Sequence, residues 1–188
     1  AIPQMADTAE VLSGLDLSQT STSLLVIVAN RRGADTAVKF REVSYLGYPF
    51  SVSETFQRRN TNSSMEEAFS DIEYIQNLCE KEGRKLVLYI SMGFGNPYGD
   101  VWNVQVVEYW VKSLYGLGIG IISLSDTVGA ADTASISSLF SGLLPAYPDV
   151  EFGAHLHTSP HNWREKLDAA WENGCRRFDG AFRGFGGC

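Results

Sequence analysis

Six short apolar runs alternate along the chain with longer segments of helical periodicity, and this alternation restricts the possible folds more than any other feature. The clearest run is Leu24–Ala29, a β-branched stretch with polar residues on both sides, which is typical of a buried strand. The six predicted strands are Leu24–Ala29, Glu42–Leu46, Lys85–Ile90, Ile119–Leu124, Val150–Ala154 and Arg176–Gly180. Apolar strands separated by helices favour an α/β fold with a parallel sheet covered by helices.

The segments between the strands carry helix signals. Ser64 followed by Glu67 forms a capping box that opens a helix reaching about Glu82, and Gly83 ends it. Further helices are predicted over Ala6–Ser13, Val101–Leu117, Ala134–Leu144 and Trp163–Glu172, the third of them opened by Asp132 or Thr133. The chain shows no repeat, low-complexity segment or linker, so we predict one domain over residues 1–188.

Two α/β architectures fit this pattern: an open doubly wound sheet and a (β/α) barrel. The dinucleotide-binding glycine fingerprint follows none of the strands, and Gly93–Gly95 runs into Asn96–Pro97, which breaks that turn. Polar or reactive residues lie at or just beyond the carboxyl ends of several strands: Ser91, Asp126, His155, His157 and Cys188. A barrel builds its active site around that whole edge, whereas an open sheet uses one switch point. The pattern therefore favours the barrel.

Composition limits the partners and the compartment. Twenty-two acidic and 15 basic residues give a net charge of −7, which argues against binding along a nucleic-acid backbone but allows a small anionic substrate. No apolar run approaches the roughly 18–20 residues of a membrane-spanning helix. Three irregularly spaced cysteines argue against a disulfide framework and for a reducing compartment.

The most specific chemical feature is the pair His155 and His157 at the end of a predicted strand. Residues two apart in an extended chain point to the same face, so the two imidazoles can take adjacent positions around one divalent metal. The alternative is a pair of packed or surface histidines, and two ligands alone are an incomplete metal site. His161, near a helix start, is expected to be exposed.

Three further segments carry weaker signals. Asp126 and Thr127 lie in a glycine turn that suits substrate binding, although Asp126 is equally suited to capping the local backbone. The Arg58–Ser63 segment is either an anion site near a helix N-terminus or a solvated loop. The Gly184–Cys188 segment is either a mobile lid carrying a reactive thiol or a surface loop. Cys79 and Cys175 are predicted to be packed.

Taken in order, several motifs resemble those of the 3-hydroxy-3-methylglutaryl-CoA (HMG-CoA) lyases over essentially the whole chain. They are Ile2–Asp7, Phe56–Ser64, Gly95–Tyr98, Ser123–Gly129, His155–His157 and Gly184–Cys188. These lyases belong to a (β/α)₈ metallolyase superfamily that also contains isopropylmalate and homocitrate synthases. The resemblance implies a (β/α)₈ TIM barrel of which this chain holds roughly strands 3 to 8. Because closure needs eight strands, six predict an open part of a barrel.

The resemblance also implies roles for individual residues. His155 and His157 match the two histidine ligands of the metal, Mg²⁺ or Mn²⁺, and His155 is implied to shuttle a proton. Cys188 matches the catalytic cysteine. Asp126 matches a catalytic residue, and Thr127 matches a residue that faces the substrate. Asn60 falls near the side where coenzyme A enters.

The activity implied is cleavage of HMG-CoA to acetoacetate and acetyl-CoA, in leucine degradation and ketone-body formation. The implied protein is a homodimer with a small acyl-CoA substrate and without nucleic-acid or membrane partners. It is placed in the cytoplasm, or in the mitochondrial matrix of a eukaryote.

Departures from the family pattern keep two alternatives open. Condensing synthases carry a Gly-Glu-Arg type loop where this chain has Gly186–Cys188, so the lyase is preferred. The family's Arg-Asp pair, a Glu and an Asn ligand have no counterpart here, so the chain is expected to begin after the second strand and stop at the cysteine. If those pieces are truly absent, the protein is a non-catalytic remnant. Thr158 and Phe185 also differ from the usual Asp and Leu.

Overall fold

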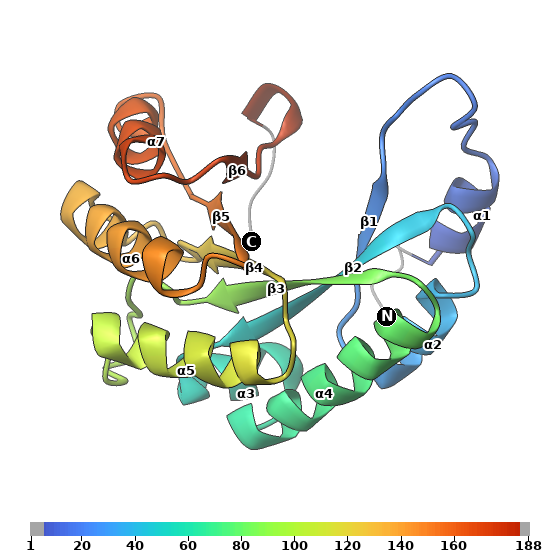
Figure 1. Cartoon of the computed structure of the whole chain (residues 1–188), viewed down its shortest axis with the longest axis horizontal. Coiled ribbons are helices and arrows are strands. Elements are labelled where there is room, and N and C mark those ends of the chain that lie inside the picture. The colour runs from blue at the N-terminus through green and yellow to red at the C-terminus, as the bar shows by residue number, and fades with distance from the viewer. Residues whose placement is uncertain (1–5, 185–188) are drawn as a thin grey trace.

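The computed structural model describes residues 6–184, and these residues form a parallel sheet of six strands, each paired with its neighbours in chain order. The strands are β1 (Leu24–Ile27), β2 (Val43–Ser51), β3 (Lys85–Ser91), β4 (Ile121–Ser125), β5 (Glu151–His155) and β6 (Arg177–Phe178). A doubly wound sheet would reverse its strand order, and this sheet does not. The described sheet runs from β1 to β6 without pairing those two edges, so it is an open, curled part of a barrel, as predicted (Figure 1).

One short helix precedes β1, and the others connect successive strands and lie along the outside of the curled sheet (Figure 1). They are α1 (Thr8–Ser13), α2 (Arg31–Ala37), α3 (Glu54–Thr61), α4 (Met65–Lys81), α5 (Val104–Gly116), α6 (Thr133–Ala146) and α7 (Trp163–Glu172), followed by a 3₁₀ turn at Phe182–Gly184. The predicted capping box of Ser64 and Glu67 is present, and Asp132 is the residue that caps α6. Both caps satisfy backbone amides that the first helical turn leaves without partners.

Side chains that alternate along the strands separate the core from the inner face of the sheet. Leu46, Phe50, Leu88 and Ile122 are fully buried in the hydrophobic core. The alternate positions face the inside of the curl, where a Cβ on Gly153 would lie 2.9 Å from Cδ of Arg177 and 3.4 Å from Oγ of Ser123. This alternation leaves the polar groups on the inner face, beside the carboxyl ends of the strands.

The segment Glu42–Leu46, predicted as a weak strand, is the start of β2, which continues to Ser51 through Pro49. Proline usually disrupts an inner strand because it has no amide hydrogen to donate. Here β1 pairs with β2 only as far as Gly47, so Pro49 lies beyond the end of that neighbour while β2 still pairs with β3. The strand therefore runs five residues further than its own sequence pattern predicts.

Helices α2 and α3 were not predicted, and the Arg58–Ser63 segment is for the most part a helix and not a loop. The buried side chain of α3 is Gln57, a polar residue that gives no apolar periodicity. Its Oε1 accepts a hydrogen bond from the Ser51 amide at 2.8 Å, and its Nε2 donates to Thr61 Oγ1 at 2.7 Å. A buried amide that satisfies its hydrogen bonds in this way replaces the usual apolar anchor.

Candidate active site

The two predicted metal ligands lie side by side at the carboxyl end of β5. His155 is the last residue of the strand and His157 follows two positions later, and their ring centroids are 5.6 Å apart. Tyr89 on the inner face of β3 meets the His155 ring edge-on at 5.8 Å. The i, i+2 spacing therefore places both imidazoles on one side of the chain.

An acidic residue that the sequence analysis did not single out contacts this pair. Asp179, just after β6, has Oδ2 2.9 Å from Nδ1 of His155, and its backbone amide donates to the Ala154 carbonyl at 3.1 Å. A carboxylate at Nδ1 fixes the proton on that nitrogen and presents Nε2 as the ligand, the arrangement common around metal-binding histidines. The one sequence signal for Asp179 was its position as an acidic residue near the end of the last predicted strand.

The histidine pair opens into a cavity of about 680 Å³, a volume within the range of small-molecule sites. Asp179, Thr158 and Gly180 line it from the strand ends, and Trp163 and Leu167 line it from α7. Tyr89 stands beside His155 with a phenol whose pKa burial raises to about 12, so the phenol remains neutral near pH 7. The cavity thus combines imidazoles, a carboxylate and apolar walls.

Asp126 lies at the same mouth, but its carboxylate is bound within the protein. Oδ1 accepts from the Ala131 amide at 2.9 Å, and Oδ2 pairs with Lys166 Nζ at 2.8 Å. Asp126 therefore caps the local backbone, which was one of its two interpretations from the sequence. It also forms a buried ion pair with Lys166 that the sequence did not suggest. A catalytic role for Asp126 stays a prediction.

Thr127 is also hydrogen-bonded to the neighbouring strand end. Its Oγ1 accepts from the amide of Met92, a buried residue held at a φ of 58° just after β3. A non-glycine residue in the left-handed region is strained, so this contact helps to hold an unfavourable turn at the mouth. Substrate binding by Thr127 stays a prediction.

Asn60 is exposed near the end of α3, and no described contact joins it to the histidine pair. The neighbouring arginines already have partners. Arg58 Nε pairs with Glu54 Oε1 at 2.6 Å, and the Arg59 guanidinium lies 4.9 Å from the centroid of the Tyr98 ring. These contacts show how the arginines are held, while the coenzyme A contact of Asn60 stays a prediction.

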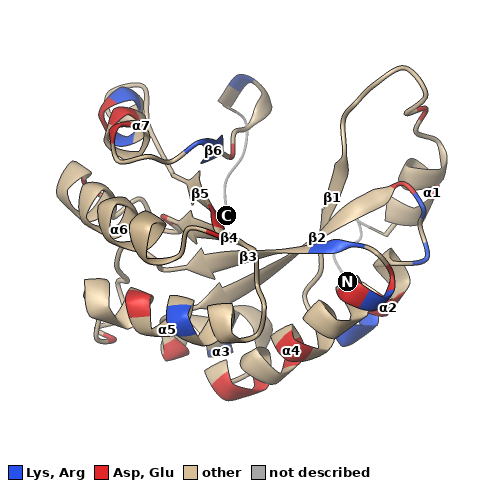
Figure 2. Cartoon of the chain, viewed as in Figure 1, with Lys and Arg blue, Asp and Glu red and all other residues tan. Residues whose placement is uncertain are grey.

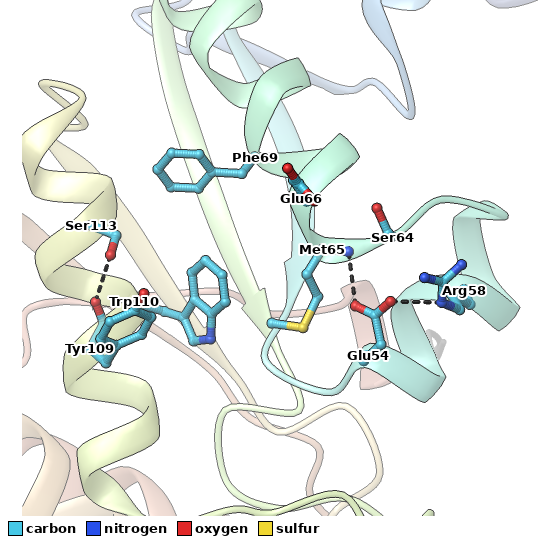
Figure 3. A pocket seen from close by; sticks show the side chains of 9 residues that line it. All are labelled: Glu54, Arg58, Ser64, Met65, Glu66, Phe69, Tyr109, Trp110 and Ser113. Carbon is cyan, nitrogen blue, oxygen red and sulfur yellow. Dashed lines mark hydrogen bonds and ion pairs between the residues drawn. The ribbon is translucent and has the colours of Figure 1, made fainter.

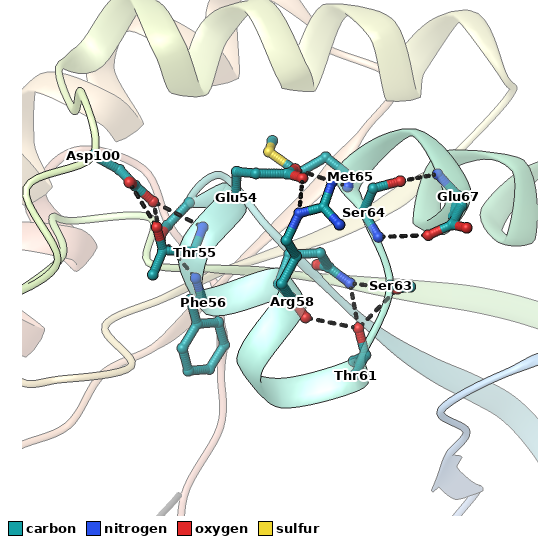
Figure 4. A network of polar contacts seen from close by, with 12 residues as sticks. Glu54, Thr55, Phe56, Arg58, Thr61, Ser63, Ser64, Met65, Glu67 and Asp100 are labelled. Atoms are coloured by element: carbon teal, nitrogen blue, oxygen red, sulfur yellow. Dashed lines mark hydrogen bonds and ion pairs between the residues drawn. The ribbon is translucent and has the colours of Figure 1, made fainter.

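A polar network attaches α3 to the loop after β3 (Figure 4). Asp100 accepts from Ser53 Oγ at 2.5 Å, from the Thr55 amide at 3.0 Å and from Thr55 Oγ1 at 2.9 Å. Asn96, within a motif that carried the family resemblance, donates to the Asp100 carbonyl at 3.0 Å. The network therefore caps the start of α3 from a segment distant in sequence.

Replacing Asp100 with alanine is expected to lower the free energy of unfolding by about 1–2 kcal/mol, since losing a helix cap has that effect. The hydrogen bond from Ser53 is the largest cause that lowers the Asp100 pKa below its ordinary 3.8. The folded state thus favours the carboxylate, so its contribution is complete above pH 3.8 and disappears as the pH falls through the lowered pKa. Urea unfolding at pH 7 and at decreasing pH measures both effects.

The exposed Asp149, for which the structure shows no side-chain contact, provides the matched control. Asp149→Ala should leave the urea midpoint unchanged. An equal loss in both variants, or a loss in Asp100→Ala that does not shrink in acid, would contradict the capping role.

A second cavity, about 570 Å³, lies between α3, α4 and α5 (Figure 3). Met65, Phe69 and Trp110 form its apolar lining, with the Glu54–Arg58 ion pair at its edge. It shares no lining residue with the histidine cavity. Acidic residues occur along α4 nearby, and Lys and Arg are interspersed over the described chain (Figure 2). The residues proposed to carry chemistry all lie outside this cavity.

The predicted packing of two cysteines is confirmed. Cys79 and Cys175 are buried free thiols; burial raises the pKa of Cys79 to about 11 and raises that of Cys175. Cys188, the predicted catalytic cysteine, lies outside the described residues. His161 is exposed, as expected.

Within residues 6–184 no three His, Cys, Asp or Glu side chains are grouped so as to hold a metal ion. Within these residues the histidine pair is therefore an incomplete ligand set. None of the helices described is both long and apolar enough to cross a membrane.

Comparisons with a family model and with curated proteins point to the same family. The HMGL-like family matches residues 1–188. The chain is 29% identical to the hydroxymethylglutaryl-CoA lyase YngG of Bacillus subtilis and 31% identical to the hydroxymethylglutaryl-CoA lyase of Pseudomonas mevalonii, covering 62% of each. It is 32% identical to the cytoplasmic 3-hydroxy-3-methylglutaryl-CoA lyase of Danio rerio and covers 55% of it. In each case all of this chain is matched.

Comparison with solved structures points to the same family. An HMG-CoA lyase from Acinetobacter baumannii in complex with coenzyme A and 3-methylmalate matches with a TM-score of 0.89 and 26% identity, over 100% of this chain and 61% of that one. The carboxyl transferase domain of Rhizobium etli pyruvate carboxylase matches with a TM-score of 0.60 at 17% identity, over 79% of this chain and 22% of that one, which shows a shared fold alone. The chain thus spans less than two thirds of the lyases that it resembles.

Proposed function

The chain belongs to the HMGL-like family, and from this membership we propose that it forms the larger part of an HMG-CoA lyase, as one partial-barrel domain with the site at its mouth. The observation that carries the proposal is the histidine pair facing a small-molecule cavity, with His155 oriented by Asp179. The proposed reaction breaks the carbon–carbon bond between a tertiary alcohol carbon and the α-carbon of an acyl thioester. Its products are acetoacetate and acetyl-CoA.

The donor set fits a divalent cation, Mg²⁺ or Mn²⁺. Two imidazoles 5.6 Å apart between centroids, one of them held at Nδ1 by a carboxylate, have the features of first ligands to such an ion. The ion, when bound, polarises the substrate hydroxyl and lowers its pKa. We propose that His155 and His157 hold it, with Asp179 fixing the His155 ring.

The remaining steps are two proton transfers and, between them, the cleavage of the carbon–carbon bond. Removing the hydroxyl proton lets the alkoxide collapse to a ketone while the electron pair of the broken bond leaves with the thioester as an enolate. A general acid must then protonate that enolate carbon, and we propose Cys188 for this step, with His155 shuttling a proton. Thr127 and Asn60 are proposed to contact the acyl-CoA substrate, and Asp126 to support catalysis at the mouth.

The setting of the protein is proposed from the same relatives. Their names include cytoplasmic and mitochondrial lyases, and the buried free thiols of Cys79 and Cys175 suit a reducing compartment, the cytoplasm or the mitochondrial matrix. Leucine degradation and ketone-body formation are the proposed processes, and a homodimer is the proposed assembly.

The direct test is cleavage of HMG-CoA by the full-length protein with Mn²⁺ or Mg²⁺, followed by the release of acetoacetate. We expect turnover that chelation abolishes and added metal restores. Condensation of acetyl-CoA with an α-keto acid, without cleavage, would instead indicate a synthase. Metal binding with neither reaction would indicate a non-catalytic relative.

A further inference from the structure

Lys166 is a charged side chain buried at the mouth of the partial barrel. It projects from α7, is 3% exposed, and pairs with Asp126, which is 1% exposed. Its Nζ lies 2.8 Å from Asp126 Oδ2, 3.0 Å from the carbonyl oxygen of His157 and 3.4 Å from that of Gly129. The ammonium thus has an acceptor for each of its three hydrogens.

Burying two charges has a large desolvation cost, and such a pair is often no more stabilising than apolar residues of the same size. Stability alone therefore does not account for this pair. Its contacts point to another role, because they connect α7 to the loop after β4 and to the chain just beyond β5.

Asp126 and Lys166 each contact the backbone of one candidate metal ligand. The amide of Asp126 donates to the His155 carbonyl at 2.9 Å, while the Lys166 ammonium donates to the His157 carbonyl. The first contact is a backbone bond that continues the pairing of β4 with β5, whereas the second comes from the side chain of the ion pair. Asp179 contacts the His155 ring directly, while the lysine contact fixes the main chain from which the His157 imidazole projects.

We propose that Lys166 is a positioning residue of the metal site, which holds His157 in register with His155 while Asp126 serves as its counter-ion. The proposal rests on the proposed function, because it assumes that the two histidines bind a metal. It goes further by proposing that the Asp126 side chain acts on the metal site indirectly, by holding Lys166 in place.

The test compares Lys166→Met, Asp126→Asn and the double variant in the full-length protein, with Lys112→Met on the exposed surface of α5 as control. Urea unfolding without metal measures stability, and titration with Mn²⁺ measures affinity. Either single variant leaves one buried charge without its partner, so both should be less stable. The double variant leaves neither charge and should regain stability.

Mn²⁺ affinity should behave differently from stability. Lys166→Met should bind Mn²⁺ 10–100-fold more weakly, the usual effect of losing an outer-shell partner, and the double variant should stay equally weak because the His157 carbonyl has still lost its donor. Affinity that recovers together with stability in the double variant would show a merely structural pair and overturn the proposal. So would unchanged affinity in Lys166→Met, or a wild type that binds no Mn²⁺.

Activity separates this proposal from the proposed function. A wild type that binds Mn²⁺ without cleaving HMG-CoA, with affinity lost in Lys166→Met, would refute the lyase and retain the positioning role. Cleavage with unchanged Mn²⁺ affinity in Lys166→Met would retain the lyase and refute the positioning role.

Discussion

Replacing His155 or His157 with alanine in the full-length protein is expected to weaken Mn²⁺ binding by more than the 10–100-fold that loss of an outer-shell partner causes. The two rings lie 5.6 Å apart between centroids at the edge of one cavity, so each should supply one bond to the same ion. Removing either leaves a single imidazole in the described part of the site. Titration with Mn²⁺, followed by the paramagnetic signal of the free ion, measures the change.

His161 gives a matched control, because it is the third histidine, is exposed and lies outside the cavity lining. His161→Ala should bind Mn²⁺ as the wild type does. The Mn²⁺ affinity of Asp179→Asn should lie between that of the wild type and that of the two alanine variants. This variant keeps both histidine ligands and removes only the carboxylate at His155 Nδ1. Unchanged affinity and stoichiometry in both alanine variants would refute a shared metal.

The histidine pair was predictable because its signal is local. In an extended chain a spacing of two residues is enough to put both side chains on one face, and the strand before it is apolar. The partial barrel was predictable for a similar reason: six apolar runs with helices between them require parallel strands, and polar strand ends mark the mouth. Neither conclusion depends on contacts between distant segments.

The partners of these histidines were not predictable, because they come from other elements. Asp179 reaches His155 from beyond β6, and its position near the end of a predicted strand does not indicate which residue it contacts. Lys166 occupies the buried face of an otherwise ordinary amphipathic helix, where a lysine normally extends its charge into water. Helix α3 was likewise not predicted, because the polar Gln57 occupies the buried position where an apolar residue is usual. In each case a polar side chain takes its position from a residue far along the chain or from a backbone group across a turn.

Cys188→Ala in the full-length protein is expected to lower kcat by on the order of 10²–10⁴, the usual effect of losing a general acid or base. The reasoning rests on the contrast with the other two cysteines. Burial raises the pKa of Cys79 to about 11 and raises that of Cys175, so both remain protonated and sheltered near neutral pH. A thiol that gives and regains a proton during turnover needs a pKa nearer the working pH, and of the three cysteines Cys188 has the glycine-rich sequence that suits a movable group.

The measurement is steady-state cleavage of HMG-CoA by Cys188→Ala, Cys188→Ser and the control Cys79→Ala, together with Mn²⁺ titration of each. Cys188→Ala should lose kcat while KM and metal affinity change much less, because no proposed metal ligand is removed. Cys188→Ser should be partly impaired, since a hydroxyl keeps the size of the thiol without its acidity. Cys79→Ala should retain kcat, because the buried thiol takes no part in proton transfer. Near-wild-type turnover in Cys188→Ala, or an equal loss in Cys79→Ala, would exclude Cys188 as the acid that protonates the enolate.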